Sequence, residues 1–222
     1  MRPARDIANE GANEGANEGA GAAPGTYWEP RVNSLVAMVA PGGFAVTGRA
    51  DLALATLLGS CVAACICDPR AGIGGLNHFL LPGDLPGDGG AAAARSATNA
   101  ARYGVHAMEM LIDEILKQGG ARPLLQAKLF GGANLTAMSP ACPVGERNRT
   151  FALDFLRREG IPVTAADLGG EHARRVFFRP AGNKVLVQAL DGDDAGRVRR
   201  EEARLRHRAG AAPASGGVGV FR

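Results

Sequence analysis

Short apolar runs alternate with turn-forming residues through the middle of the chain. Runs of this length bounded by Gly, Pro and Asp predict β-strands, and they occupy residues 36–39, 43–46, 52–58, 61–67, 73–81, 125–130, 162–167, 175–179 and 184–190. Two other segments repeat apolar residues at i, i+3 and i+4, the spacing of a helix that buries one face. We expect helices from near Ser96 or Thr98 to Gln118 and from near Gly145 to Glu159, each followed by a glycine that can end it.

Strands dominate this pattern, and they do not alternate regularly with helices. A doubly wound parallel sheet requires that alternation, so we predict an α+β fold built from mostly antiparallel sheets.

The ends of the chain differ from this core. Residues 8–19 repeat ANEG, whose only apolar side chain is alanine, and such a segment cannot bury enough surface to offset its chain entropy. We therefore predict a disordered low-complexity tail over residues 1–27, a folded domain over 28–191, and a charged, Gly/Ala-rich tail over 192–222.

Composition excludes several classes of protein. Apolar residues make up 46% of the 222 residues and charged residues 21%, so the chain is not wholly disordered. The net charge of +3, without basic runs that include aromatic residues, argues against a nucleic-acid partner. No apolar run reaches the ~18–20 residues that span a bilayer, and the first residues lack the apolar part of a secretory signal. The four cysteines do not form a disulfide framework, so we expect a cytoplasmic protein without membrane insertion.

The candidate chemistry lies in the two apolar runs 61–67 and 73–81, which begin with Cys61 and contain His78. The turn-forming residues 68–72 between them predict a hairpin. A two-residue loop would place Cys61 opposite His78, and a four-residue loop would place it opposite Leu80 with His78 as a diagonal neighbour on the same face. A three-residue loop would place His78 on the other face. The pairing therefore requires an even loop.

A cysteine beside a histidine can hydrolyse an amide. The imidazole takes the thiol proton, the thiolate attacks the carbonyl carbon, and the imidazolium then protonates the departing amine. Gly59 allows a substrate to approach the backbone, and amide N–H groups near Cys61 could hold the oxyanion. We expect Cys61 and His78 to meet in a small cleft open to the substrate.

Two other interpretations of these residues remain open. Cys61, Cys65, Cys67 and His78 could simply be core residues of two buried strands. They also carry soft ligands suited to zinc, but the spacing spreads the sulfurs along ~20 Å of extended strand, so we expect neither a metal nor a cofactor. Cys142 has no visible partner in the sequence.

Several motifs in a fixed order resemble the chemoreceptor glutamine deamidase family, CheD, over about residues 35–190. They are Gly59-Ser60-Cys61-Val62, Asn77-His78, Leu81-Pro82, Tyr103-Gly104, Ala127-Lys128-Leu129-Phe130-Gly131-Gly132-Ala133, Gly145-Glu146-Arg147-Asn148 and Gly169-Gly170. The resemblance implies an α/β/β three-layer sandwich, in which two main helices cover an outer face of stacked sheets, as in the cytotoxic necrotizing factor type of deamidase.

The resemblance also implies an activity. A cytoplasmic bacterial enzyme of chemotaxis would convert selected glutamines of methyl-accepting chemoreceptors to glutamate through a thioester, and some members bind a CheC-type phosphatase. The family nucleophile maps onto Cys61 and its base onto His78. The family threonine lies six residues before the cysteine, where this chain has Ala55, so the third catalytic position is assigned to Thr56, one residue later.

Other motif residues receive supporting roles. Gly131 and Gly132, like Gly59 and Ser60, are candidates for substrate approach or oxyanion binding, although paired glycines can also simply form tight turns. Asn148 and its neighbour Arg147 are expected to hold a loop by hydrogen bonds to carbonyls. Two alternatives to the deamidase remain: a non-catalytic adaptor for chemoreceptors or the phosphatase, and another thiol hydrolase, such as a methylesterase or peptidase.

Overall fold

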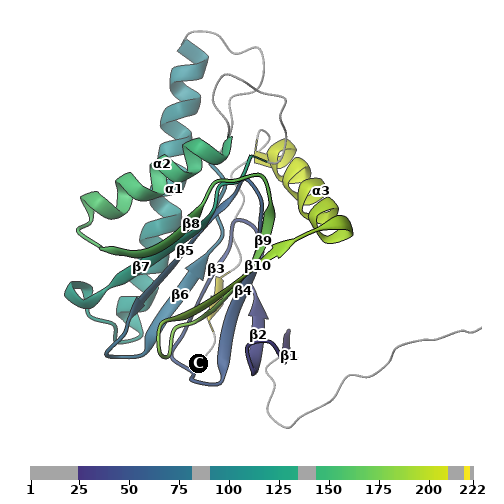
Figure 1. The fold of residues 1–222 in the computed structure, drawn as a ribbon. Helices are drawn as coiled ribbons and strands as arrows, with labels where there is room; N and C mark the ends of the chain where they lie inside the picture. Colours follow the sequence, from purple (N-terminus) through teal and green to yellow (C-terminus); the bar gives the residue numbers. More distant parts are fainter. Residues whose placement is uncertain (1–24, 82–90, 135–143, 210–217, 221–222) are drawn as a thin grey trace, which may run out of the picture.

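The computed structural model describes residues 25–81, 91–134, 144–209 and 218–220, which form eleven strands, three α-helices and one short 3-10 helix (Figure 1). The strands are β1 (Thr26–Glu29), β2 (Ser34–Met38), β3 (Phe44–Thr47), β4 (Leu52–Leu58), β5 (Val62–Asp68), β6 (Ile73–Asn77), β7 (Gln126–Gly131), β8 (Val163–Leu168), β9 (Ala173–Arg179), β10 (Lys184–Leu190) and β11 (Val218–Val220). The helices are α1 (Ala91–Lys117), η1 (Arg122–Leu124), α2 (Val144–Arg158) and α3 (Gly192–Ala209).

The strands form two sheets. One has the order β1-β2-β4-β9-β10 and the other the order β11-β3-β6-β5-β7-β8. Most neighbouring strands are antiparallel, whereas β2 with β4, β7 with β8 and β3 with β11 are parallel. Both α1 and α2 lie against the second sheet (Figure 1), and the predicted α+β sandwich with two helices on an outer face is confirmed.

The central strand β5 is buried on both faces, which explains its nearly continuous apolar sequence. Its side chains at Val62, Ala64 and Ile66 pack against apolar residues of α1 and α2. The alternate side chains, from Cys61 to Cys67, pack between the two sheets against residues such as Leu54 and Phe178. The face of β5 that carries Cys61 therefore belongs to the core between the sheets.

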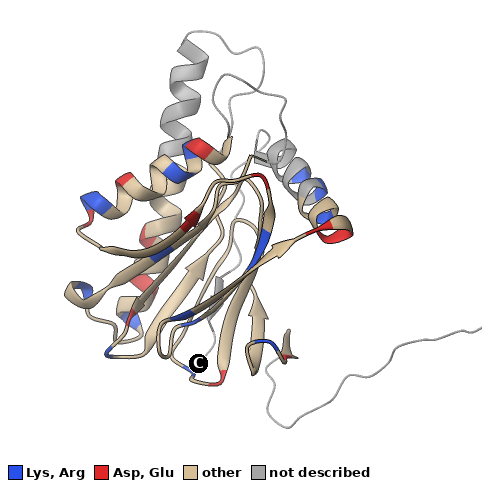
Figure 2. Ribbon diagram, viewed as in Figure 1, with Lys and Arg blue, Asp and Glu red and all other residues tan. Residues whose placement is uncertain are grey.

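Both main helices end close to the predicted positions, whereas α1 begins at Ala91, before the predicted Ser96 or Thr98. α1 ends at Lys117, and Gly119 follows with φ of 106°, a backbone conformation that suits glycine after a helix. α2 ends at Arg158, and Gly160 follows with φ of 68°. Figure 2 shows charges of both signs along α2 and few charged residues within the strands, as expected for an exposed helix face over an apolar sandwich. None of the described helices is long and apolar enough to cross a membrane.

The helix α3 lies in the segment for which the sequence predicts a tail. Its Ala195 and Val198 are buried against Ala173 and Leu190 of the first sheet, so the first turns of α3 pack on the domain. The predicted tail of residues 1–27 lies outside the described residues as far as residue 24, as do Cys142 and residues 210–217 and 221–222. The domain boundaries at 28 and 191 stay predictions.

Candidate active site

The register of the β5–β6 hairpin places Cys61 and His78 on one face of their sheet. Asp68 pairs with Ile73, so the loop contains four residues, and the predicted even loop is confirmed. An isolated bridge between Val62 and Phe79 continues the same register beyond the end of β6. Cys61 is then opposite Leu80, and His78 is its diagonal neighbour, at the roughly 7–8 Å between Cα atoms that such positions have.

Thr56 reaches this face from the opposite sheet. It lies on β4, where Leu54 and Leu58 point into the core between the sheets, and Thr56 shares their side of the strand. Its Oγ1 lies 2.7 Å from Nδ1 of His78, and the same hydroxyl donates to the carbonyl oxygen of Val39 at 2.8 Å. The structure thus brings together His78 and Thr56, the two residues assigned as base and third catalytic residue.

The offset of Thr56 from the family spacing has a structural explanation. Counting faces by alternate residues holds only along one continuous strand. Here the chain leaves the first sheet at Leu58 and enters the second at Val62, and the turn Gly59–Cys61 joins them. Parity counted back from Cys61 therefore does not carry across this crossing, and the face that Thr56 takes is set on β4 itself, where Ala55 packs on the opposite face.

The hydrogen bonds of Thr56 determine which nitrogen of His78 carries the hydrogen. A hydroxyl has one hydrogen, and Thr56 donates it to the Val39 carbonyl, which can only accept. Oγ1 therefore accepts from Nδ1 of His78, so Nδ1 is protonated. In a neutral imidazole Nε2 then carries the lone pair of a base. This Nε2 is buried and has no hydrogen-bond partner within the described parts of the chain.

Burial keeps His78 neutral. The side chain is only 3% exposed, and the loss of hydration lowers the pKa of His78 from 6.5 to about 4. At neutral pH its imidazole is therefore in the form that can accept a proton from a thiol.

The site is closed in this structure. Cys61 has no exposed surface and packs in an apolar cluster with residues that include Leu58, Leu80 and Phe130. The expectation of a cleft open to the substrate is wrong for this structure, because the face of β5 that carries Cys61 is also the face on which the two sheets pack. A substrate can reach the sulfur only when neighbouring side chains move aside.

The paired glycines at the end of β7 pack against the turn that carries Cys61. The Gly132 amide donates to the Cys61 carbonyl at 2.7 Å, and the Ala133 amide donates to the Gly59 carbonyl at 2.7 Å. A Cβ at Gly131 would collide with that Cys61 oxygen, and φ at Gly131 is 102°. The Gly132 amide hydrogen is thus committed to the backbone. Both glycines serve close packing here, while the roles of Gly59 and Ser60 toward a substrate stay predictions.

Asn148 joins the two segments that carry the thiol and the imidazole. Its Nδ2 donates to the Ser60 carbonyl at 2.7 Å, and its Oδ1 accepts from the Leu81 amide at 3.0 Å. The predicted role of Asn148 in holding a loop by a bond to a carbonyl is confirmed.

The other two cysteines of β5 behave as core residues. Cys65 and Cys67 are at most 1% exposed. Burial, as the largest cause, raises the pKa of Cys65 well above its ordinary value and that of Cys67 to about 11. Both are protonated at neutral pH and unsuited to nucleophilic attack.

Comparison with known proteins identifies the family. A family model described as "CheD chemotactic sensory transduction" matches residues 81–189. A protein of Xanthomonas campestris named "Probable chemoreceptor glutamine deamidase CheD" is 43% identical over 195 residues, which is 88% of this chain and 93% of its own. Proteins with the same name from Bordetella petrii and Rhizobium rhizogenes are 47% and 50% identical over 74% and 68% of this chain, and over 70% and 78% of their own. The chain belongs to the CheD family.

Among solved structures, a hypothetical protein of Bacillus licheniformis, YfiH, matches 56% of this CheD chain and 50% of its own. It has 13% sequence identity and a TM-score of 0.37, a likeness too slight to support an argument.

Sequence reasoning missed the part of the site that consists of backbone atoms. The Gly42 amide donates to the His78 carbonyl at 2.7 Å, and the His78 amide donates to the Gly43 carbonyl at 3.0 Å. With the Val39 carbonyl that accepts from the Thr56 hydroxyl, the segment 39–43 holds the backbone of His78 and the side chain of Thr56. The only signal in the sequence was the turn Ala40-Pro41-Gly42, whose glycine has φ of 80°.

Tyr103 of α1 borders the same segment. A Cβ at Gly42 would lie 3.3 Å from its hydroxyl oxygen. Burial first, and the charge of a Cys61 thiolate second, raise the pKa of Tyr103. The Tyr103-Gly104 motif thus lies near the thiol in space, although it is about forty residues away in the chain.

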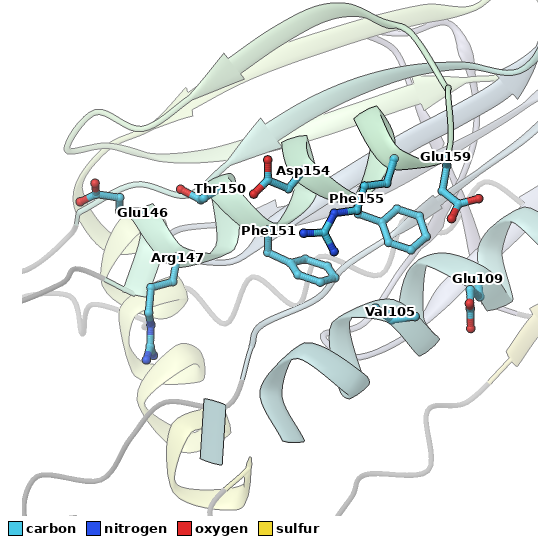
Figure 3. A pocket seen from close by; sticks show the side chains of 10 residues that line it. Val105, Glu109, Glu146, Arg147, Thr150, Phe151, Asp154, Phe155 and Glu159 are labelled. Atoms are coloured by element: carbon cyan, nitrogen blue, oxygen red, sulfur yellow. The ribbon is translucent and has the colours of Figure 1, made fainter. Parts of the chain in front are cut away.

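A cavity of about 600 Å³ lies elsewhere, between α1 and α2 (Figure 3). Phe151 and Phe155 of α2 line it together with Val105 of α1, and charged residues such as Glu109 and Glu146 surround them. None of its lining residues is a cysteine or histidine. This cavity is therefore separate from the thiol and the imidazole.

Proposed function

We propose that this chain hydrolyses the side-chain amide of selected glutamines on methyl-accepting chemoreceptors, with Cys61 as nucleophile, His78 as base and acid, and Thr56 as the residue that orients His78. Its class is that of its relatives, a protein-glutamine glutaminase of bacterial chemotaxis. The proposal places the reaction in the cytoplasm, with a CheC-type phosphatase as a second partner.

The reaction begins with proton transfer from the Cys61 thiol to Nε2 of His78. The thiolate then attacks the glutamine carbonyl carbon and forms a tetrahedral intermediate. As the C–N bond breaks, the imidazolium returns the proton to the leaving nitrogen, which departs as ammonia and leaves a thioester. A water molecule, deprotonated by Nε2, attacks the thioester carbon. The C–S bond breaks, the sulfur regains a proton, and glutamate is released.

One observation carries this proposal: the Thr56 hydroxyl fixes Nδ1 of His78 as the protonated nitrogen and leaves the buried Nε2 as a base without a hydrogen-bond partner among the described residues. Nε2 belongs to a side chain on the same inter-sheet face as Cys61. A core histidine with a purely structural role would be expected to satisfy both ring nitrogens, because an unpaired buried nitrogen costs about 1–3 kcal/mol.

The experiment is incubation of the purified protein with chemoreceptor cytoplasmic fragments, followed by mass spectrometry and an ammonia assay. We expect a mass increase of about 1 Da at specific glutamines with matching ammonia release, as the replacement of NH₂ by OH requires, and neither with Cys61→Ala. Binding of the fragment by wild-type protein without any mass change would instead support the adaptor. Cleavage of the chain would support a peptidase, and release of methanol from methylated fragments would support a methylesterase.

A further inference from the structure

We infer that Asn148 is a positioning residue for the reaction, because it sets the distance and orientation between Cys61 and His78. This inference rests on the proposed function. Asn148 lies in the first turns of α2, outside the hairpin that carries the two catalytic groups, and is fully buried.

The two hydrogen bonds of Asn148 reach the backbone on both sides of the catalytic pair. One goes to the carbonyl of Ser60, the residue immediately before Cys61, at 2.7 Å. The other comes from the amide of Leu81, three residues after His78, at 3.0 Å. We call this arrangement, made of Asn148, Ser60 and Leu81, the Asn148 bridge.

The bridge acts at the end of the β5–β6 ladder, where the pairing of these two strands stops being regular. The regular pairing of β5 with β6 includes Cys65 and Leu76, and beyond it only the isolated bridge between Val62 and Phe79 continues the ladder. Ser60 and Leu81 lie outside the strands. A shift of the turn at Ser60 relative to the chain at Leu81 would change the separation of the thiol and the imidazole, and the Asn148 bridge opposes that shift.

The chemistry of the bridge requires a carboxamide. One atom must donate to a carbonyl while another accepts from an amide in a fixed fork, and asparagine has both groups. An aspartate of the same size would accept from Leu81 but could not donate to Ser60 when ionised, and an alanine would do neither. Close contact makes the fit possible, since a Cβ at Gly145 would lie 2.5 Å from the Gly132 oxygen, and α2 could not then approach the site.

The test compares Asn148→Asp and Asn148→Ala with a matched control, Asp68→Asn. Asp68 is also buried, and its carboxylate accepts from the amides of Arg70, Ala71 and Ala121. The control therefore makes the reverse exchange of carboxylate and carboxamide in an equally buried position. It lies at the far end of β5 from Cys61, about 23 Å away at ~3.3 Å per residue. Circular dichroism sets a temperature at which every variant is at least 95% folded.

We expect the two Asn148 variants to lower kcat for glutamine deamidation about 10- to 100-fold, with KM within about threefold of wild type, because small misplacements of reacting groups act on the chemical step. Asp68→Asn should keep kcat within about twofold. Equal kcat values for the three variants at matched folded fraction would overturn the positioning role.

A second measurement does not depend on deamidation. The rate of Cys61 alkylation by iodoacetamide, followed on the Cys61 peptide by mass spectrometry, is measured against pH. We expect the midpoint to move by half a pH unit or more in both Asn148 variants and to stay at the wild-type value in Asp68→Asn. Coinciding midpoints in all four proteins would refute the inference. Absence of ammonia release by the wild-type protein would refute the proposed function alone, and the alkylation midpoints would still decide the role of Asn148.

Discussion

Replacement of Thr56 by valine would remove the hydroxyl that orients His78 while keeping the shape of the side chain. In the structure Oγ1 lies 2.7 Å from Nδ1 and 2.8 Å from the Val39 oxygen. Thr56→Val therefore leaves the Nδ1–H without an acceptor and the Val39 carbonyl without this donor. It also removes the constraint that keeps the lone pair on Nε2.

The expected magnitude follows from the change of charge on His78 during the reaction. A neutral hydrogen bond contributes about 0.5–1.5 kcal/mol, and one from a charged group about 1.5–3 kcal/mol. When His78 becomes an imidazolium, its bond to Thr56 should therefore strengthen by roughly 1–1.5 kcal/mol. At 1.36 kcal/mol per tenfold, the loss of this bond should lower kcat by about 5- to 13-fold, and further if the hydrogen moves to Nε2.

The assay is the initial rate of ammonia release from a chemoreceptor cytoplasmic fragment at saturating concentration, normalised to the folded fraction. Thr56→Ser is the control, since it keeps the hydroxyl and should remain within about threefold of wild type. A folded Thr56→Val protein with wild-type kcat would refute the orienting role. Equal losses in the serine and valine variants would show that the methyl group matters and the hydroxyl does not.

Three further predictions concern stability. The free energy of unfolding should fall by about 3 kcal/mol between pH 6.5 and pH 4, because the unfolded chain binds a proton at His78 in this window and the folded protein, with a pKa of about 4, does not. Urea titrations should show that His78→Gln lacks this loss, and the same pH dependence of the unfolding free energy in His78→Gln as in wild type would contradict the prediction. Gly131→Ala should be more destabilising than Gly160→Ala, since both residues have positive φ but only Gly131 faces the Cys61 oxygen, so equal urea midpoints would exclude that collision. Asp68→Asn should lower the thermal midpoint, because the side-chain NH₂ group of asparagine would face a backbone N–H group from which the carboxylate now accepts a hydrogen bond. An unchanged midpoint would show that these bonds contribute nothing to stability. The hydrogen bond from the Ala121 amide, as the largest cause, lowers the pKa of Asp68 from 3.8, so its contribution to stability should be lost progressively as the pH falls from 3.8 through that lowered pKa, and the difference in stability between wild type and the variant should narrow on acidification.

Local patterns predicted the elements that depend on local interactions. The hairpin and both main helices follow from turn residues and apolar spacing, and α2 differs from its prediction by one residue at each end. α1 begins at Ala91, earlier than the predicted Ser96, because a run of alanines favours a helix without any apolar period to reveal it. The short strand β11 was missed, since its pairing with β3 joins segments from opposite ends of the chain.

The candidate site could be predicted only in part. The parity of the hairpin loop placed Cys61 and His78 on one face of the sheet. Both faces of this strand are apolar in sequence, so the pattern cannot tell whether the face with Cys61 is open to solvent or covered by the other sheet. The closed state of Cys61 was therefore missed. The approach of Thr56 to His78 depends on how two sheets stack, and the backbone groups of residues 39–43 carry no signature in side-chain pattern.

The most direct test of the account compares three variants, each with one cysteine replaced. Deamidation of the same chemoreceptor fragment is measured per folded molecule. We predict that Cys61→Ala releases no measurable ammonia, whereas Cys65→Ser and Cys67→Ser retain most of the wild-type kcat, because their buried thiols stay protonated. Equal activity in all three variants, or equal loss at matched stability, would contradict the claim that the Cys61 sulfur attacks the glutamine.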